Sequence, residues 1–459
     1  MIRDDPQGAG GTAVVRGGVT DGRVVAADVL GDLRSGMLLD AAFDRRAAPM
    51  DARDRRWTQE LVFGTLRRRG WIDAVLDRCV RGGLSRIDPE LTDVLRLGVY
   101  QLLFMGSVPP YAAIAQSVEL AKQRRGIGAS KLANAVLRRV DRERSDLRPE
   151  GGVQDPVEAL AITHSHPRWL VARWVQRWGI AHTRQLLDAN NTEPPLIVRP
   201  FGVVREQLEA SLERSGVTCE DAPLVHDSVR LVGPLALTEL GAFRQGMLCV
   251  QDPAATLVAK DAAFEANGVV ADLCAAPGGK ALELSHRAAL VVAGDRAASR
   301  LGRLRENVLR LDARNVQLVA MDAREPALGM VDGVLIDVPC TGTGTLRRHP
   351  DARWRLKVSD LAVMATTQRA ILESASAIVR PGGLLVYSTC SLEPEENDAP
   401  VDAFLARHPE WTLEPPPEHT VPESVIDAGR LRVLPHRHGV DGAFAVRLRR
   451  LDVPGTLAA

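Results

Sequence analysis

The sequence has few cysteines and no long apolar run, and each of these shortages excludes a class of protein; lysine is also scarce. Six cysteines scattered over 459 residues are too few for a disulfide framework, and none form the Cys-x-x-Cys pairs typical of structural zinc sites. The longest apolar runs are far shorter than the roughly 20 residues that a membrane-spanning helix needs. The first residues lack an apolar signal-peptide core. We therefore expect a cytoplasmic protein that uses neither a membrane nor a metal.

What remains is the composition of an ordinary globular protein. Hydrophobic residues make up 45% of the chain and charged residues 25%, with a formal net charge of zero. Only five of the 58 basic residues are lysine. We attribute that bias to genomic base composition, although arginine would also suit an RNA surface. A chain of this length exceeds one ordinary core, so two or three domains are expected.

The N-terminal third is predicted to be helical. Residues 1–22 are Gly-rich and aperiodic, which predicts a disordered tail. From 23 to 148 apolar residues recur at helical spacing without any strand signal, which predicts an all-α domain. The stretch 90–106, "ELTDVLRLGVYQLLFMG", is apolar nearly all round and is predicted to be its central helix.

The rest of the chain predicts two further domains. A charged Gly- and Pro-containing linker at 144–156 leads into a strand–helix–strand pattern, which indicates a small α+β insert over 160–245. From 246 to 452, five short runs rich in Val, Leu and Ile alternate with helical stretches, a pattern typical of a doubly wound parallel sheet. Ligands in such folds bind beyond the carboxyl ends of the strands.

A glycine turn follows the first of these five runs, in "DLCAAPGGK" (272–280). Small residues after a strand let the backbone approach a ligand, and the next helix offers free N–H groups. The turn is neither a Gly-x-Gly-x-x-Gly nor a Walker A loop, so dinucleotides and nucleoside triphosphates are disfavoured. A tight turn without a ligand remains the alternative. The candidate cofactor-binding residues of this turn are Cys274, Ala275, Ala276, Pro277, Gly278, Gly279 and Lys280.

Two aspartates end the next two strand runs. Asp295 suits a bidentate grip on ribose hydroxyls, and Asp322 could reach a nucleoside base. Either one alone is more often a helix cap or a turn residue. Together with the glycine turn they outline a pocket for a nucleoside that bears a carboxylate, such as S-adenosylmethionine.

Two thiols follow the last two runs, Cys340 in "DVPC" and Cys390 in "STC". A lone cysteine is usually a small buried hydrophobe, and we expect that of Cys79, Cys219 and Cys249. Two thiols at one sheet edge suggest nucleophilic catalysis beside a methyl donor. A thiolate added at C6 of cytosine makes C5 nucleophilic enough to take a methyl group. An acidic group near N3 is also needed, and Asp337 is placed for it.

Arginines and a tryptophan fill the loop "RRHPDARWR" (347–355), just after Cys340. Arg347, Arg348, Arg353 and Arg355 could hold phosphates, and the indole ring could stack on a base. A solvated loop is the plainer interpretation, and the position beside Cys340 favours RNA. The two histidines of "HRHGVDG" are too few for a metal site.

Four motifs resemble the RsmB (Sun) family of bacterial ribosomal-RNA cytosine-5 methyltransferases. They are "DLCAAPGGK", "DVPCTGTGTLRRHPDARWR", "YSTCSLEPEEN" and "LPHRHGVDGAFAVRLRR". Upstream, "LGVYQLLFMGSVPPYAAIAQSVELAK" and "KLANAVLRRV" resemble the NusB-like RNA-binding domain joined to these enzymes. The similarity covers about residues 23–450.

The resemblance implies a function and a role for each motif residue. Cys390 would be the nucleophile, Cys340 would assist adduct breakdown, and Asp337 would hold the cytosine and border the cofactor. Lys280 would lie near the reacting base, although a cation that stabilises the loop is an alternative. Residues 274–280 would bind S-adenosyl-L-methionine, with Asp295 on the ribose and Asp322 near the adenine. The implied substrate is 16S ribosomal RNA, and the implied enzyme is a monomer.

Other functions remain open at this point. A tRNA substrate would use the same chemistry. A non-catalytic RNA-binding factor would be expected to have lost a cysteine or Asp337, and both cysteines and Asp337 are intact. An amino-group methyltransferase would carry an Asn/Asp-Pro-Pro-aromatic motif where this chain has "DVPC".

Overall fold

The computed structural model describes residues 15, 16, 18–233 and 235–452, and their contacts form two compact units. Unit 1 runs to Leu187 and also takes in His349–Trp354, whereas unit 2 comprises Asp188–Arg348 and the chain from Arg355 onward. The predicted tail lies mostly outside the described residues. At its end, strands β1 (Val15–Arg16) and β2 (Val19–Thr20) pair, and the first helix begins at Asp21. The helical domain therefore starts slightly earlier than predicted.

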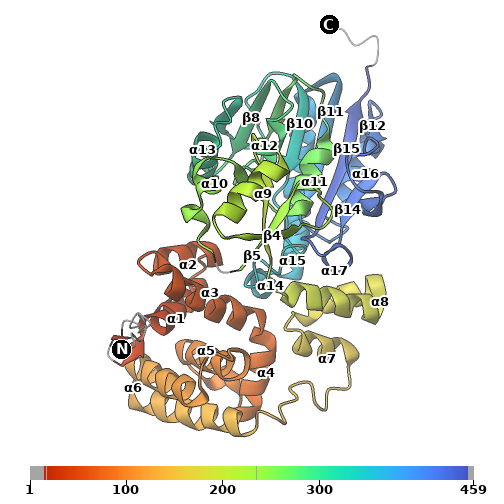
Figure 1. Ribbon diagram of the computed structural model, residues 1–459. Coiled ribbons are helices and arrows are strands. Elements are labelled where there is room, and N and C mark those ends of the chain that lie inside the picture. Colours follow the sequence, from red (N-terminus) through yellow and green to blue (C-terminus); the bar gives the residue numbers. More distant parts are fainter. Residues whose placement is uncertain (1–14, 17, 234, 453–459) are drawn as a thin grey trace, which may run out of the picture. The chain divides into compact units, whose positions relative to one another are not determined.

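Unit 1 is a bundle of helices (Figure 1). The helices are α1 (Asp21–Arg34), α2 (Leu39–Ala47), α3 (Ala52–Arg67), α4 (Arg69–Cys79), α5 (Pro89–Phe104), α6 (Pro110–Arg142), α7 (Pro156–Thr163) and α8 (Arg168–Asn191).

Helix α5 is the centre of this bundle, as its all-round apolar pattern predicts. Val94, Leu95 and Val99 have no exposed surface, and α5 packs against α1, α3, α4 and α6. Asp88 caps its N-terminus by accepting hydrogen bonds from the backbone N–H groups of Glu90 and Leu91, at 2.9 and 3.3 Å. The burial of so much apolar surface is the main stabilising contribution to unit 1.

After α5 the chain forms α6, which is interrupted at Gly126. That residue has φ 80° and ψ −172°, a conformation outside the helical region that glycine adopts at little cost. Helix α8 is interrupted in the same way at Gly179.

The small insert is a four-stranded antiparallel sheet with two helices. Its strands are β3 (Leu196–Pro200), β4 (Thr218–Asp221), β5 (Val229–Val232) and β6 (Leu248–Val250), in the order β4-β5-β3-β6, and its helices are α9 (Arg205–Arg214) and α10 (Gly241–Arg244). Strand β6 lies beyond the predicted boundary at 245 because a three-residue strand has too few positions to show an alternating pattern.

The C-terminal domain contains all five predicted strand runs. They are β7 (Val269–Asp272), β8 (Leu290–Asp295), β9 (Val316–Ala320), β10 (Val331–Asp337) and β11 (Val379–Thr389). All neighbouring pairs among the five are parallel, in the order β9-β8-β7-β10-β11. The fold class is therefore confirmed as a doubly wound α/β domain.

The parallel core is extended by antiparallel strands that the pattern did not predict. Strand β15 (Ala443–Arg450) pairs antiparallel with β11. Next to β15 in the sheet lie β14 (Arg430–Val433) and then β13 (Ile426–Asp427), and β12 (Trp411–Glu414) pairs with the C-terminal part of β15. The sheet is thus mixed rather than purely parallel.

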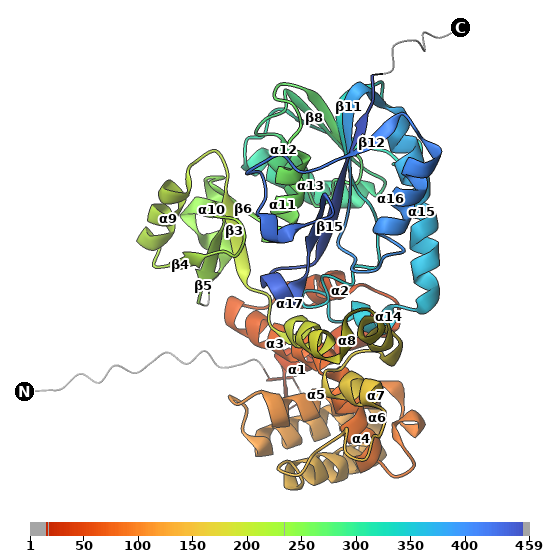
Figure 2. The same cartoon turned by 90° about the vertical axis from the view of Figure 1, so that its right-hand side faces the viewer.

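Helices cover both faces of this sheet, as Figure 2 shows. One face packs against α11 (Pro253–Ala262), α12 (Gly279–Leu284) and α13 (Ala298–Arg310), and the other against α15 (Val358–Ala377) and α16 (Asp398–Arg407). Successive side chains of β10 point to opposite faces of the sheet. Leu335 packs in the core on the side of α11, α12 and α13, and its neighbours Val334 and Ile336 pack in the core on the side of α15 and α16.

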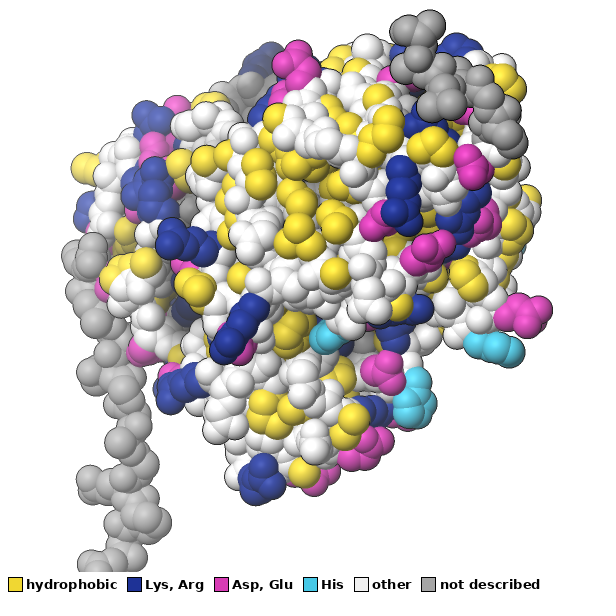
Figure 3. Space-filling view, turned by 90° about the horizontal axis from the view of Figure 1, so that it is seen from above, with side chains coloured by type: hydrophobic (Ala, Val, Ile, Leu, Met, Phe, Trp, Pro, Cys, Tyr) yellow, Lys and Arg dark blue, Asp and Glu magenta, His cyan; other side chains and the backbone are white. Residues whose placement is uncertain are grey.

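The surface carries charges of both signs, as expected from the zero net charge. On the face drawn in Figure 3, Lys and Arg side chains lie among Asp and Glu side chains, and hydrophobic side chains gather near the middle. Within the part of the chain that the structure describes, no helix has the length and hydrophobicity to cross a membrane.

Candidate active site

Four parallel strands end at one edge of the sheet, which we call the carboxyl edge. Strand β7 ends at Asp272, β8 at Asp295, β10 at Asp337 and β11 at Thr389. The register pairs Asp337 with Ser388 and Leu335 with Asp272, which brings these ends to the same level. The predicted site residues of the first, second, fourth and fifth runs therefore meet here.

The two cysteines are the most prominent pair at this edge. Their Sγ atoms are 3.3 Å apart, within hydrogen-bonding distance for thiols, although 50 positions separate them in sequence. Both side chains are half-buried, and neither is in a disulfide. The hydrogen bond with Cys390, burial, and the charges of Cys390 and Glu396 hold the pKa of Cys340 well above its usual value. The arrangement favours a Cys340 that keeps its proton beside the Cys390 sulfur.

Lys280 and Asp337 form an ion pair beside the cysteines. Lys280 Nζ is 2.6 Å from Asp337 Oδ2, and the Ser388 hydroxyl donates a 2.8 Å hydrogen bond to Asp337 Oδ1. Burial opposes the charge on Lys280, but Asp337, Asp272 and Cys390 outweigh it and raise its pKa. The site thus keeps a cation within the electrostatic reach of the Cys390 sulfur.

The glycine turn before Lys280 is held in place by backbone contacts. A Cβ atom on Gly278, whose φ is 113°, would stand 2.1 Å from Leu304 Cδ1, so only glycine fits there. The Ala275 N–H donates to the Gly294 carbonyl at 2.8 Å, and the Arg300 guanidinium donates to the Ala276 carbonyl at 2.9 Å. Gly278 is therefore required at least by packing within the domain.

Cys274 differs from the other two cysteines of the domain's motifs. Burial, followed by the charges of Asp272, Asp337 and Asp295, strongly raises the pKa of its thiol. A thiol that stays protonated is a poor nucleophile. Cys274 therefore belongs to the packing of the turn rather than to the chemistry.

Asp272 is a polar residue of the edge to which sequence reasoning gave no role. It is 1% exposed, its Oδ1 accepts a 3.3 Å hydrogen bond from the Cys274 N–H, and its Oδ2 has no hydrogen-bond partner. Burial and the charge of Asp337 raise its pKa to about 7. The only signal in the sequence was an acid at the end of an apolar strand. A buried oxygen without a partner is costly, so this one fits a ligand group that donates a hydrogen bond.

The two aspartates predicted to bind a nucleoside lie in different environments: Asp295 is the last residue of β8, and Asp322 lies two residues after the end of β9. Asp295 is 4% exposed, and its Oδ1 accepts a 2.9 Å hydrogen bond from the Ala297 N–H. Asp322 is half-buried and bonded to Arg324, which lowers its pKa to about 2. Both carboxylates keep lone pairs that could accept hydrogen bonds from hydroxyl or amino groups.

Arg199 of β3 connects the small insert to the glycine turn. Its guanidinium donates to the Gly279 carbonyl at 3.2 Å and to Gln251 Oε1 at 2.7 Å, and it pairs with Glu283 at 2.8 Å. The side chain is buried. Sequence reasoning missed this role because the bonding partners lie about 50 to 80 positions further along the chain.

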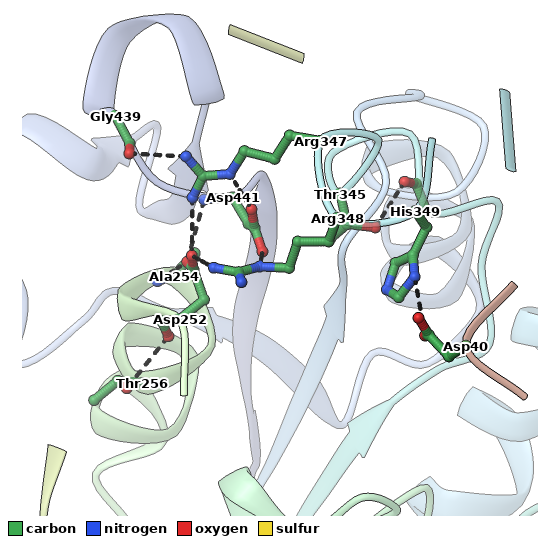
Figure 4. A network of polar contacts seen from close by, with 11 residues as sticks. Asp40, Asp252, Ala254, Thr256, Thr345, Arg347, Arg348, His349, Gly439 and Asp441 are labelled. Carbon is green, nitrogen blue, oxygen red and sulfur yellow. Dashed lines mark hydrogen bonds and ion pairs between the residues drawn. The ribbon is translucent and has the colours of Figure 1, made fainter. Parts of the chain in front are cut away.

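The expectation of phosphate contacts fails for Arg347, which is buried in a cluster of four charges (Figure 4). Arg347 Nε and one terminal nitrogen contact Asp441 and Asp252 at 2.5 and 3.0 Å, and Arg348 donates to the same two carboxylates. Both aspartate side chains are 7% exposed. A guanidinium enclosed in this way is not available to a phosphate. Arg348 is half-buried in the same cluster.

Arg353 is also not a surface residue, Trp354 is half-buried, and both belong to unit 1. Arg353 has no exposed surface and donates to the Ser165 carbonyl at 3.2 Å. The Trp354 indole donates to the Leu66 carbonyl at 2.9 Å, and its ring lies against Gly70, where a Cβ would be 2.8 Å away. The prediction for Arg353 is therefore corrected. Arg355 is exposed and keeps its predicted role as a proposal.

Comparisons with known families and structures agree with the fold. The chain matches the 16S rRNA methyltransferase RsmB/F family over 262–449, the NusB family over 20–142, and the RsmF/B-like ferredoxin-like domain over 166–238. The crystal structure of PH0851 is 26% identical with a TM-score of 0.78, and the match covers 96% of this chain and 100% of that one. Fold and site thus define a Rossmann-like methyltransferase with helical and ferredoxin-like domains.

Relatives with known names indicate which kind of methyltransferase this chain resembles. The "Probable ribosomal RNA small subunit methyltransferase B" of Synechocystis is 34% identical over 426 residues, 90% of this chain and 95% of that protein. "Ribosomal RNA small subunit methyltransferase B" of Yersinia pseudotuberculosis is 34% identical over 436 residues, 93% and 98% of the two chains. NSun6 from Pyrococcus horikoshii, solved with SFG, shares the fold at 22% identity and a TM-score of 0.55, covering 62% of this chain and 98% of that one. This chain belongs to the RsmB/F family of 16S rRNA methyltransferases.

Proposed function

We propose that this methyltransferase acts on C5 of a cytosine in 16S ribosomal RNA, through a covalent bond between Cys390 and C6 of the base. The observation that carries the proposal is the pair of sulfurs 3.3 Å apart beside the Lys280–Asp337 ion pair. Simple methylation of an exposed nitrogen or hydroxyl would need no thiol. Methylation at C5 needs one, because the unmodified ring carbon is a weak nucleophile.

Each neighbouring group has a place in this chemistry. When the Cys390 thiolate bonds to C6, electrons move into the ring toward N3. The proton held between Lys280 and Asp337 neutralises that charge, and the Ser388 hydroxyl keeps the carboxylate oriented. The target base must leave its stack to reach this edge.

Cys340 is suited to the second half of the reaction. Two of the causes that raise its pKa are its hydrogen bond with Cys390 and the charge of the Cys390 thiolate. Both are lost once Cys390 has become a neutral thioether. Cys340 then loses its own proton to solvent more easily, and the resulting thiolate can accept the C5 proton. Departure of that proton, return of the N3 proton to the Lys280–Asp337 pair and cleavage of the C6–S bond restore the aromatic ring and the Cys390 thiolate.

The methyl donor is S-adenosyl-L-methionine, which supplies an electrophilic methyl group when bound. The residues that would hold it are the turn 274–280, Asp295 for the ribose, and Asp322 for the adenine. The unpartnered buried oxygen of Asp272 and the acceptor capacity of Asp295 support this fit. Arg348 and Arg355 remain candidates for RNA contact, and we propose a monomeric cytoplasmic enzyme.

The test of this function is bisulfite sequencing of 16S rRNA and tRNA from cells with and without the protein. The proposal predicts one or more 16S cytosines that resist conversion only when the protein is present. Complementation with Cys390→Ala should leave those cytosines convertible. A protein-dependent mark in tRNA alone would overturn the ribosomal substrate, and a 16S mark at a nitrogen or ribose would overturn the chemistry.

A further inference from the structure

The acidic turn that follows Cys390 lies inside the protein. Glu396 has no exposed surface, and its neighbour Asn397 is 2% exposed. Transfer of a carboxylate from water to such a place is costly unless several donors satisfy it. The question is therefore which groups this carboxylate holds.

One set of donors comes from the Cys340 loop. The Thr341 N–H donates to Glu396 Oε1 at 2.8 Å, and the Thr341 hydroxyl donates to Oε2. Gln368 of α15 donates both to Glu396 Oε1, at 3.0 Å, and to the Pro339 carbonyl, at 2.9 Å. The residues on both sides of Cys340 are thus tied to Glu396 or to its partner Gln368.

The other donor comes from the Cys390 loop. The Ser391 hydroxyl donates to Glu396 Oε2. The next residue of the turn strengthens this link, because Asn397 accepts a 2.5 Å hydrogen bond from the Thr389 hydroxyl and donates to the Ser391 carbonyl at 2.9 Å. The residues on both sides of Cys390 are therefore tied to the same turn.

We propose that Glu396 is a positioning residue that sets the separation of the two active-site sulfurs. Its carboxylate is shared by the residue after Cys340 and the residue after Cys390, which come from different strand ends. Gln368 completes the bridge by holding the residue before Cys340. Neither side chain touches a cysteine sulfur in any contact the structure gives, so both position the sulfurs through the neighbouring residues, while the charge of Glu396 also raises the pKa of Cys340.

This inference rests on the proposed function for its catalytic consequence but not for its geometry. If nucleophile and proton acceptor must face one ring, a change in their separation lowers the rate of the chemical step. Substrate affinity depends on other surfaces. The expected signature is a loss in kcat with little change in KM for RNA.

The direct test measures the sulfur pair without RNA or cofactor. Diamide takes two electrons and two protons from a pair of thiols, which become a disulfide while the reagent becomes a hydrazine. Sulfurs 3.3 Å apart need only a small approach to reach the roughly 2.05 Å of a disulfide. The rate at which the full-length protein forms the Cys340–Cys390 disulfide, followed by mass spectrometry of peptides, reports their relative position.

Two variants test the bridge. Glu396→Gln keeps the shape of the side chain but replaces one acceptor oxygen by a donor. Gln368→Leu removes the hydrogen bonds that the Gln368 side chain donates to Glu396 and to the Pro339 carbonyl. The control is Glu325→Gln, an exposed carboxylate of the same domain. We expect about tenfold slower disulfide formation and about tenfold lower kcat in each bridge variant, because each loses a hydrogen bond to a buried charged group. The control should match the wild type.

Thermal unfolding first shows which variants are folded. If Glu396→Gln does not fold, Gln368→Leu alone tests whether the bridge sets the separation of the sulfurs. Disulfide rates in folded bridge variants within twofold of the control would overturn the inference, even if 5-methylcytosine is still made. A slowed disulfide in a protein that makes no 5-methylcytosine would instead uphold the bridge and overturn the proposed function.

Discussion

Replacement of Arg347 by methionine is expected to destabilise unit 2 strongly and to leave RNA affinity nearly unchanged. The wild-type guanidinium contacts Asp441, Asp252 and the Gly439 carbonyl at 2.5, 3.0 and 3.1 Å. Methionine fills much of the space but leaves two buried carboxylates with Arg348 as their remaining cation.

The magnitude follows from the burial of the cluster. Removing one partner of a buried ion pair costs about 3–5 kcal/mol, since an uncompensated charge stays behind. For a unit of this size that loss lowers the melting temperature by roughly 10 °C. Exposed Arg355 provides the control, because its replacement by methionine should change stability by less than about 0.5 kcal/mol while weakening RNA binding.

Calorimetry of the three proteins, together with filter binding of 16S fragments at one fixed salt concentration, separates stability from affinity. If Arg347→Met melted with the wild type and lost RNA affinity, the guanidinium would be facing RNA and the interpretation of the cluster would be wrong.

The remaining predictions concern the sulfurs and one buried acid. Cys390→Ala should abolish methyl transfer, measured as incorporation of labelled methyl groups into 16S RNA, and normal turnover would exclude this residue as the nucleophile. Cys340→Ala should leave a protein–RNA adduct that survives a denaturing gel, and absence of any adduct during turnover would argue against its role in release. Asp261 is 1% exposed, neither of its carboxylate oxygens has a hydrogen-bond partner, and burial raises its pKa from 3.8 to about 7. A raised carboxyl pKa stabilises the fold fully below pH 3.8, and this contribution is lost as the pH rises to about 7. Asp261→Asn should therefore match the wild type near pH 4 and exceed it by about 4 kcal/mol at pH 8; equal melting temperatures at pH 8 would refute the burial argument.

The carboxyl edge could be predicted from sequence because its signals are local. Each apolar run ends in an aspartate or cysteine, and parallel strands bring such ends together. Cys340 and Cys390 met as expected for this reason. Cys79 and Cys249 are buried, as expected of lone cysteines, whereas Cys219 is only half-buried.

The fate of the arginine loop could not be predicted in this way. The sequence of a basic loop does not show whether its arginines are solvated or buried. The partners of Arg347 lie about 95 positions away in both directions along the chain. The same applies to Glu396, whose turn looks like a polar surface loop until Thr341 and Gln368 are placed against it. Short strands such as β6 were not predicted, because three residues are too few to show an alternation of apolar and polar positions.

The most direct measurement is the identity of the protein atom bonded to RNA in the Cys340→Ala adduct. The adduct would be trapped with 16S RNA and S-adenosyl-L-methionine, digested with nuclease and protease, and analysed by tandem mass spectrometry. The account predicts a cytidine that carries an added methyl group, attached to the peptide that contains Cys390. A nucleotide on any other residue, or on Cys390 through a base other than cytosine, would contradict it.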